Sequence, residues 1–471
     1  MTAGPWLRWH VRRPAGRDRD LRAATAVGRR RRIAVAAAGV YLQFDRTFRD
    51  LVTSAGSLVA TTVVTSVLGF VFWLAAARFF SPAAVGLAAS AITTMTLLGT
   101  VGVLGLGTLL IGEFGRQPGR ERSLMTTALA TSASASLALG LCFILVTPHV
   151  APSLGLPGGT DFAALFAVGT AMTAVALVFD SAILGLLRGG LQLLRNSSFA
   201  LGKLLALLVA GAVLHAGSGR SIFYTWVFGA ALSLSTVAGL GLATRSFGIV
   251  ARPSWSMLRG LRRAAVGHHA VNLGLQAPAL ALPAVATITM SAAKTASFYV
   301  AWQVAAFSFM TPVALSMALY AVAGTSPARL FRTVRMTLLL GIAAALVSIA
   351  ILLVLAGQIL RIFGDAYTTE GPAVLRIVCL CALPLVVKDI YIALGRIRGR
   401  LRNTAVLVIG GAVLEVLLAA AGAHVAGLPG FAAAALVTES MVGLAAVPTV
   451  VRALRPPREQ APLGQAGERT G

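Results

Sequence analysis

Six ionisable side chains interrupt long apolar segments, and they are the residues of this sequence whose types could carry chemistry. They are four acids and two bases: Asp180, Asp389, Glu415, Glu439, Lys203 and Lys388. A charge inside a bilayer is costly, so such residues usually face an aqueous cavity or pair with one another. We therefore expect them to serve transport chemistry or internal ion pairs.

Asp180 and Asp389 occupy matching places in two similar stretches of sequence. Each is followed by an Arg-Gly pair, at Arg188 and Arg398, and then by Leu-Arg-Asn and a Ser or Thr, at nearly the same offset. Two interpretations stay open. Each aspartate is either a cavity charge for coupling or gating, or half of a local ion pair that holds a helix end.

Glu415 and Glu439 lie near the middle of their apolar segments, out of reach of either membrane surface. A proton or a sodium ion could neutralise such carboxyl groups, which makes both glutamates candidates for coupling. The alternative is a structural hydrogen bond. No equivalent acid occurs in the two corresponding segments of the first half.

Basic residues are the candidates for binding an anionic substrate, because charge-assisted contacts to phosphate are strong. Lys203 could bind phosphate as a point charge or extend to the membrane surface. The arginines near the segment ends could bind an arriving headgroup or act only as topology signals. The substrate-binding candidates are Arg188, Arg195, Lys203, Lys388, Arg398 and Arg402.

Prolines inside apolar segments predict bent helices. Pro278 and Pro283 are five residues apart, so the segment that holds them is expected to bend most. It is a gating candidate, and a static kink is the alternative. Pro384 predicts a further kink near Asp389.

Composition decides the class of protein. The 471 residues carry a formal charge of +25, but only 12% are charged, 57% are hydrophobic and the mean hydropathy is +0.84. Soluble domains are about 25% charged, so a soluble nucleic-acid binder is excluded and no nucleic-acid partner is expected. Three cysteines exclude a disulfide scaffold, and we expect neither a metal site nor a cofactor.

Apolar segments of about 20 residues, long enough to span a bilayer as helices, repeat along the chain from residue 51. The pattern predicts an all-α polytopic membrane protein with about twelve spans: 52–77, 84–112, 124–147, 162–187, 198–216, 222–244, 265–289, 296–323, 336–357, 373–395, 404–424 and 431–451. Alternate loops hold 17 arginines, and the other loops hold only four basic residues. The positive-inside rule then places the arginine-rich loops and both termini in the cytoplasm.

The domain organisation follows from this count. We predict a basic N-terminal tail (1–50), a first six-helix lobe (51–244), a cytoplasmic linker (245–264), a second six-helix lobe (265–451) and a C-terminal tail (452–471). We expect both tails to be disordered. The repeated Asp, Arg-Gly and Leu-Arg-Asn pattern indicates that the lobes are parallel repeats.

Loop sequences carry a family resemblance. The segment from Trp73 to Gly86 resembles the first hairpin of polysaccharide-biosynthesis membrane proteins. These are the O-antigen-flippase-like (Wzx-type) branch of the multidrug/oligosaccharidyl-lipid/polysaccharide exporter (MOP) superfamily. The segment from Leu360 to Tyr367 resembles the loop before their tenth helix. Leu187-Arg188-Gly189 resembles their loop between helices four and five.

The resemblance implies two lobes around a central cavity and transport by alternating access. It implies movement of an undecaprenyl-diphosphate-linked oligosaccharide from the inner to the outer leaflet of a bacterial inner membrane, in cell-envelope or polysaccharide biosynthesis. A glycan polymerase and glycosyltransferases would then be partners.

Other functions stay open. A cation-coupled multidrug exporter of the same superfamily is the nearest alternative, and a lipid II flippase would need additional helices. A membrane glycosyltransferase or ligase is disfavoured, because the longest outer loops hold few acids. The sequence contains no nucleotide-binding or hydrolase motif, so we expect a transporter and not an enzyme.

Overall fold

The computed structural model describes residues 64–114, 119–154, 156, 158–186, 188–213, 217–244, 253–322 and 327–455. Both predicted tails fall outside the described residues, except for residues 452–455 at the end of the last helix. The first part of the predicted linker, residues 245–252, also lies outside them. Residues 255–264 of the predicted linker form the start of a long helix.

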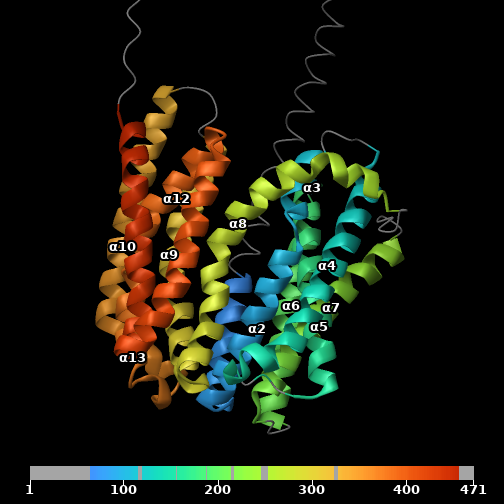
Figure 1. The fold of residues 1–471 in the computed structure, drawn as a ribbon. Coiled ribbons are helices and arrows are strands. Elements are labelled where there is room, and N and C mark those ends of the chain that lie inside the picture. Colours follow the sequence, from blue (N-terminus) through green and yellow to red (C-terminus); the bar gives the residue numbers. More distant parts are fainter. Residues whose placement is uncertain are drawn as a thin grey trace, which may run out of the picture. The chain divides into compact units, whose positions relative to one another are not determined.

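The described residues form helices and turns, without a strand among them (Figure 1). The first half comprises the helix Val64–Phe79, α2 (Pro82–Gly102), α3 (Leu106–Glu113), α4 (Glu121–Val150), α5 (Thr160–Gly185), α6 (Gly189–Leu208), a π-helical turn (Val209–Val213) and α7 (Gly219–Thr244). The second half comprises α8 (Trp255–Thr289), α9 (Ala292–Val322), α10 (Pro327–Phe363), α11 (Gly371–Cys379), α12 (Ala382–Ile397) and α13 (Leu401–Ala453). Helices satisfy their own backbone hydrogen bonds, which is what a chain in hydrocarbon requires.

Nine of the described helices are long and apolar enough to cross a membrane, and the bent pair α11 and α12 makes a tenth span. The 53-residue α13 is two helices, because the backbone is non-helical at Ala426 and Gly427. A Cβ atom built on Gly422 would lie 2.3 Å from the Gly430 oxygen, so the chain folds back there. With the shorter helix Val64–Phe79, the described residues confirm the predicted polytopic all-α fold of about twelve spans.

Two predicted spans are broken in the middle. Leu104 (φ 53°) and Gly105 (φ 75°) separate α2 from α3 in the predicted span 84–112. Glycine adopts this left-handed conformation without strain, whereas leucine does not. The span 373–395 bends by 40° between α11 and α12. The bend precedes Pro384, whose ring nitrogen has no hydrogen to donate to the preceding turn.

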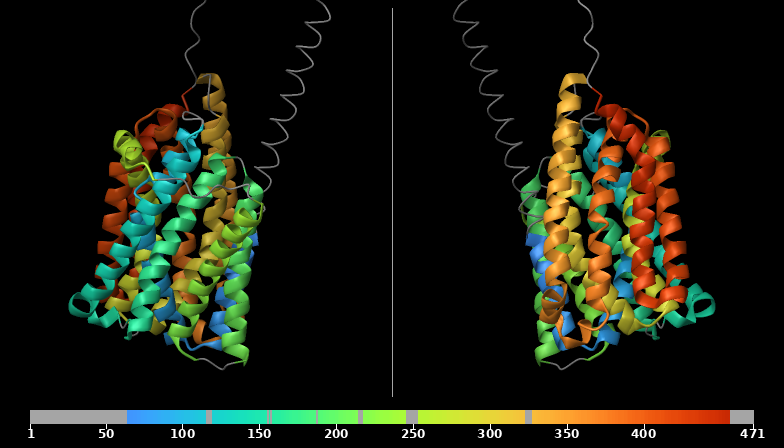
Figure 2. Two further views of the ribbon diagram at one scale, coloured as in Figure 1. Left: turned by 90° about the vertical axis from the view of Figure 1, so that its right-hand side faces the viewer. Right: turned by 90° about the vertical axis from the view of Figure 1, so that its left-hand side faces the viewer.

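Helices pack mainly within each half. In the first half α4 packs on α5 and α6 packs on α7, while α9 to α13 pack on one another in the second half. Helix α2 also contacts α8 and α9, and α8 packs along α13 (Figure 1). Figure 2 shows the bundle from two further sides, with α10 and α13 in front in its right view. Helices α2, α8 and α9 therefore carry much of the contact between the halves.

One end of the bundle is closed by backbone contacts, and we call it the Gly86 end. A Cβ atom built on Gly86 would lie 1.6 Å from the Ala292 oxygen, so α2 and α9 touch directly. A Cβ atom on Gly219 would lie 2.7 Å from the Ala84 oxygen. The Arg78 Nε atom donates to the Ile362 carbonyl at 2.7 Å. Small residues allow such close helix contacts in membranes.

Candidate functional site

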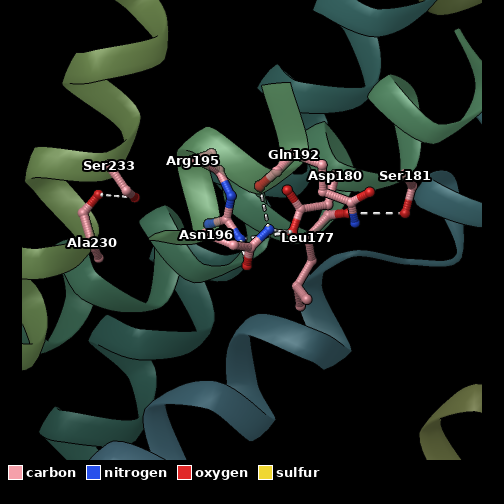
Figure 3. A network of polar contacts seen from close by, with 8 residues as sticks. All are labelled: Leu177, Asp180, Ser181, Gln192, Arg195, Asn196, Ala230 and Ser233. Carbon is pink, nitrogen blue, oxygen red and sulfur yellow. Dashed lines mark hydrogen bonds and ion pairs between the residues drawn. The ribbon is translucent and has the colours of Figure 1, made fainter. Parts of the chain in front are cut away.

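Asp180 of α5 is held by an ion pair at the corner between α5 and α6. The Arg195 Nη2 atom lies 2.7 Å from the Asp180 Oδ2 atom, and the Asn196 Nδ2 atom donates to the same oxygen at 3.3 Å (Figure 3). Asn196 also accepts from Arg195 at 2.7 Å and donates to the Gln192 carbonyl at 2.9 Å. This arrangement fastens two helices together, so the geometry corresponds to the local ion-pair alternative for Asp180.

The matching residues of the second half make different contacts. Arg195 is buried, but Arg402, its counterpart in the repeated pattern, is exposed. Asp389 is buried, and its Oδ2 atom has no hydrogen-bond partner among the described residues. The Asp180 Oδ1 atom also has no hydrogen-bond partner among the described residues, so the difference between the two aspartates is the arginine that pairs with Asp180.

The predicted coupling residues Asp389, Glu415 and Glu439 lie close to the predicted substrate-binding residue Lys388 in one largely buried cluster, which we call the acid cluster. The Lys388 ammonium pairs directly with Glu439. Glu415 is only 2% exposed and interacts electrostatically with Glu439 and Lys388. Helix α12 supplies two of these residues, and the two arms of α13 supply one glutamate each.

The charges of the acid cluster do not balance. Three carboxyl groups lie near one ammonium group, and Arg396 adds a second positive charge that acts on Asp389. The second Glu439 oxygen, Oε2, has no hydrogen-bond partner among the described residues. An uncompensated negative charge is costly in a low-dielectric site. The cluster is therefore suited to take up a proton or a monovalent cation.

The bend between α11 and α12 lies beside the acid cluster. The Leu380 and Cys381 nitrogens donate to the Ile377 and Val378 carbonyls, so the chain tightens at the break. Cys381 interacts electrostatically with Glu439 and Glu415. A broken helix next to buried acids gives the acid cluster a backbone that can change conformation.

Lys203 of α6 lies in a cage of aromatic rings. Its Nζ atom is 3.7 Å from the centroid of Trp226, 4.5 Å from that of Phe199 and 4.9 Å from that of Phe72. The residue is 4% exposed, so its side chain does not extend to a membrane surface. In the part of the chain that the structure describes, no carboxylate pairs with it.

The remaining candidates lie elsewhere. Arg188, Arg398 and Arg402 are exposed at the turns that flank α6, α12 and α13. Helix α8 continues through Pro278 and Pro283, and the Pro283 carbonyl accepts from Ser90 of α2 at 2.9 Å. The structure therefore brings the second-half acids together and leaves the loop arginines apart from them.

Two features were missed in the sequence. Phe199 and Lys203 are four residues apart on one helix face, which signals a contact, but Phe72 and Trp226 come from other helices. The pairing of Lys388 with Glu439 joins residues 51 positions apart and leaves no local signal.

Solved structures resemble this fold. An inward-facing multidrug resistance MATE family transporter of the MOP superfamily superposes with a TM-score of 0.66, covering 84% of this chain and 96% of that chain. Its sequence identity is 16%. This chain has the MATE transporter fold. The all-α polytopic fold expected from the apolar segments agrees with this match, whereas the Wzx-type branch stays a prediction.

Two further MATE-fold structures match along most of their length. An outward-facing multidrug resistance MATE transporter has a TM-score of 0.62 at 13% identity, covering 86% of this chain and 96% of that chain. A MOP transporter from Pyrococcus furiosus, whose reverse pocket polarity suggests a different function, has a TM-score of 0.64 at 13% identity, covering 85% and 95%. No family model and no curated protein matches the chain.

Proposed function

We propose that this protein is a cation-coupled membrane exporter that works by alternating access between two six-helix lobes. The observation that carries the proposal is the acid cluster, in which the buried Asp389 and Glu415 and the partly buried Glu439 share one ammonium group. A site with excess negative charge in a low-dielectric interior can take up and release a proton or a sodium ion. The unpartnered oxygens of Asp389 and Glu439 are the atoms available to that cation.

The acid cluster can link cation binding to a change in how α12 and α13 pack. When no cation is bound, Lys388 neutralises Glu439 and holds α12 to the second arm of α13. A proton or sodium ion on the carboxyl groups weakens the attraction for Lys388. The contact between α12 and the second arm of α13 then loosens, and the bend beside Cys381 allows α12 to change its angle relative to α11.

The proposed substrates are amphipathic organic compounds, as for a multidrug exporter. The support is the fold, since two of the similar structures are described as multidrug resistance transporters. The cell membrane is the proposed location, with the arginine-rich turns and both termini facing the cytoplasm.

A lipid-linked oligosaccharide flippase is the second candidate, and Lys203 is the observation that favours it. A buried ammonium group that pairs with no carboxylate in the part of the chain that the structure describes is suited to a diphosphate. The exposed Arg188, Arg398 and Arg402 could then bind the headgroup before it enters. Bacterial polysaccharide assembly, with a polymerase and glycosyltransferases as partners, is the setting of this candidate.

The coupling proposal is tested by Glu439→Gln, which removes the charge that Lys388 neutralises and keeps the shape. Proton-driven and sodium-driven efflux of a cationic dye should fall at least tenfold in membrane vesicles, with normal expression. Glu370→Gln is the matched control, because Glu370 pairs with Lys294 at the exposed surface. Normal driven efflux in Glu439→Gln would reject the coupling role.

A strain that lacks the gene for this protein separates the two substrate classes. Deletion that leaves dye efflux unchanged and makes lipid-linked glycan accumulate on the inner leaflet would favour the flippase. Deletion that abolishes dye efflux and leaves the glycan distribution unchanged supports the exporter.

A further inference from the structure

We propose that Lys203 and its aromatic cage form a latch that keeps the Gly86 end closed, and that an anion bound by Lys203 releases it. The proposal rests on the alternating-access function and adds to it a control element in the first half. It starts from a charge that pairs with no carboxylate among the described residues. Lys203 is 4% exposed, and its ammonium group lies over three aromatic rings.

The cage joins three helices. Phe199 comes from α6, Trp226 from α7 and Phe72 from the helix Val64–Phe79. A desolvated cation is strongly attracted to the face of an aromatic ring. The ammonium therefore ties the helix Val64–Phe79 to α6 and α7.

The helix Val64–Phe79 also contacts the second half. Phe70 makes edge contacts with Phe307 and Phe363, at centroid distances of 5.6 and 5.2 Å. Trp73 packs edge-on against Tyr299 of α9 at 4.6 Å. Whatever holds this helix to the first half therefore also holds the two halves together.

A line of contacts connects the cage with the Gly86 end. The ring centroids of Trp226 and Trp73 are 6.2 Å apart, and Trp73 contacts Tyr299. Tyr299 and Thr295 are one helical turn apart on α9, so they share a face. The Thr295 hydroxyl lies 2.9 Å from that of Thr287 on α8.

The line ends in a polar seal between α2 and α8. The Ser90 hydroxyl lies 2.9 Å from the Thr287 hydroxyl and donates to the Pro283 carbonyl at 2.9 Å. Ser90 is 0% exposed and lies one turn from Gly86 on α2. Opening of the Gly86 end must break these hydrogen bonds and expose Ser90.

An anion is the chemistry that would release the latch. An ammonium group binds an anionic oxygen more strongly than a ring face in a low-dielectric site, because full charges attract more than a quadrupole. An anion that draws Lys203 from the rings removes the tie to Phe72. The two halves are then freer to separate at the Gly86 end.

The test measures the exposure of Ser90. Ser90→Cys is introduced into a background that carries Cys142→Ala, Cys379→Ala and Cys381→Ala, and its reaction with a water-soluble maleimide is timed in detergent. Adding Lys203→Ala should accelerate labelling about tenfold, which corresponds to about 1.4 kcal/mol. Lys203→Arg keeps a cation on the rings and should label at the parent rate.

A second buried serine shows whether Lys203→Ala opens the Gly86 end alone or destabilises the whole fold. Ser136→Cys reports on another fully buried serine, inside the first half, and its labelling should stay unchanged in Lys203→Ala. Equal acceleration at both cysteines, or none at Ser90→Cys, overturns the latch. If Lys203→Ala does not accumulate, Trp226→Leu replaces it, with Trp226→Phe as the variant that keeps a ring.

The anion is tested with pyrophosphate. It should accelerate labelling of Ser90→Cys in the parent and leave the rate in Lys203→Ala unchanged. No acceleration in the parent, or equal acceleration in both, overturns release by an anion. These labelling experiments and the efflux experiment test different proposals. If Lys203→Ala accelerates labelling of Ser90→Cys and Glu439→Gln keeps normal cation-driven efflux, the coupling proposal is rejected and the latch is retained.

Discussion

At the scale of single residues, the two repeated aspartates have different surroundings. Each has one buried oxygen without a described hydrogen-bond partner, but Asp180 has an arginine and an asparagine on its other oxygen. A buried carboxylate with good partners stabilises a fold, and one without them costs free energy. Stability measurements can therefore separate a structural aspartate from one that is kept for transport.

Asp180→Asn should destabilise the protein. The substitution leaves the buried Arg195 guanidinium without its counter-charge, and breaking a buried pair in this way costs about 3–5 kcal/mol. Thermal unfolding in detergent measures the effect as a lower Tm. An unchanged Tm would show that the pair contributes no stability.

Asp389→Asn should leave the Tm unchanged or raise it. The substitution removes a carboxylate from a cluster that already holds two other carboxyl groups and one ammonium. Fewer like charges in a low-dielectric site are favourable. A loss of Tm as large as that of Asp180→Asn would argue that Asp389 is also a structural residue.

At the scale of elements, the breaks in the helices determine where side chains can meet. The turn at Ala426 and Gly427 divides α13 and sends its second arm back along the first. Only this reversal brings Glu439 beside Lys388 and Glu415. A straight 53-residue helix would separate Glu415 and Glu439 by about 36 Å at 1.5 Å per residue.

Gly427→Ala should destabilise this turn. Gly427 has φ 59° and ψ −141°, a region that residues with a Cβ atom avoid at a cost of about 1–3 kcal/mol. Gly410→Ala is the control, since Gly410 is helical and a Cβ atom there meets nothing within 4 Å. The measurement is the Tm of each variant, and equal Tm values would contradict the assigned turn.

At the scale of the whole molecule, the distribution of arginines predicts orientation. Lys294 lies at the Gly86 end, near Ala292, and Arg398 lies in the turn between α12 and α13. The positive-inside rule places Lys294 outside and Arg398 inside.

A membrane-impermeant thiol reagent should label Lys294→Cys in intact cells of the cysteine-free background and should not label Arg398→Cys. Permeabilised cells should label both, which shows that both positions can react. The reverse result in intact cells would invert the orientation and place the arginine-rich turns outside.

Composition and hydropathy alone predict the class of the protein, the approximate number of spans and the short list of intramembrane charges. Hydropathy is summed over about 20 residues, and burial in hydrocarbon excludes most charges, so both signals are local and strong. The bend beside Pro384 was also predictable, because a proline acts on its own helix.

The partners of these charges depend on how the helices pack. Asp180 and Asp389 look alike in sequence, but Asp180 pairs with an arginine from the next helix, whereas Asp389 lies near Lys388 and near Glu439, which the turn at Gly427 brings close. The aromatic cage of Lys203 likewise needs rings from three helices. Helix packing in a membrane depends on close side-chain fit rather than on a hydrophobic pattern. Residues far apart in the chain therefore become partners without any local signal in the sequence.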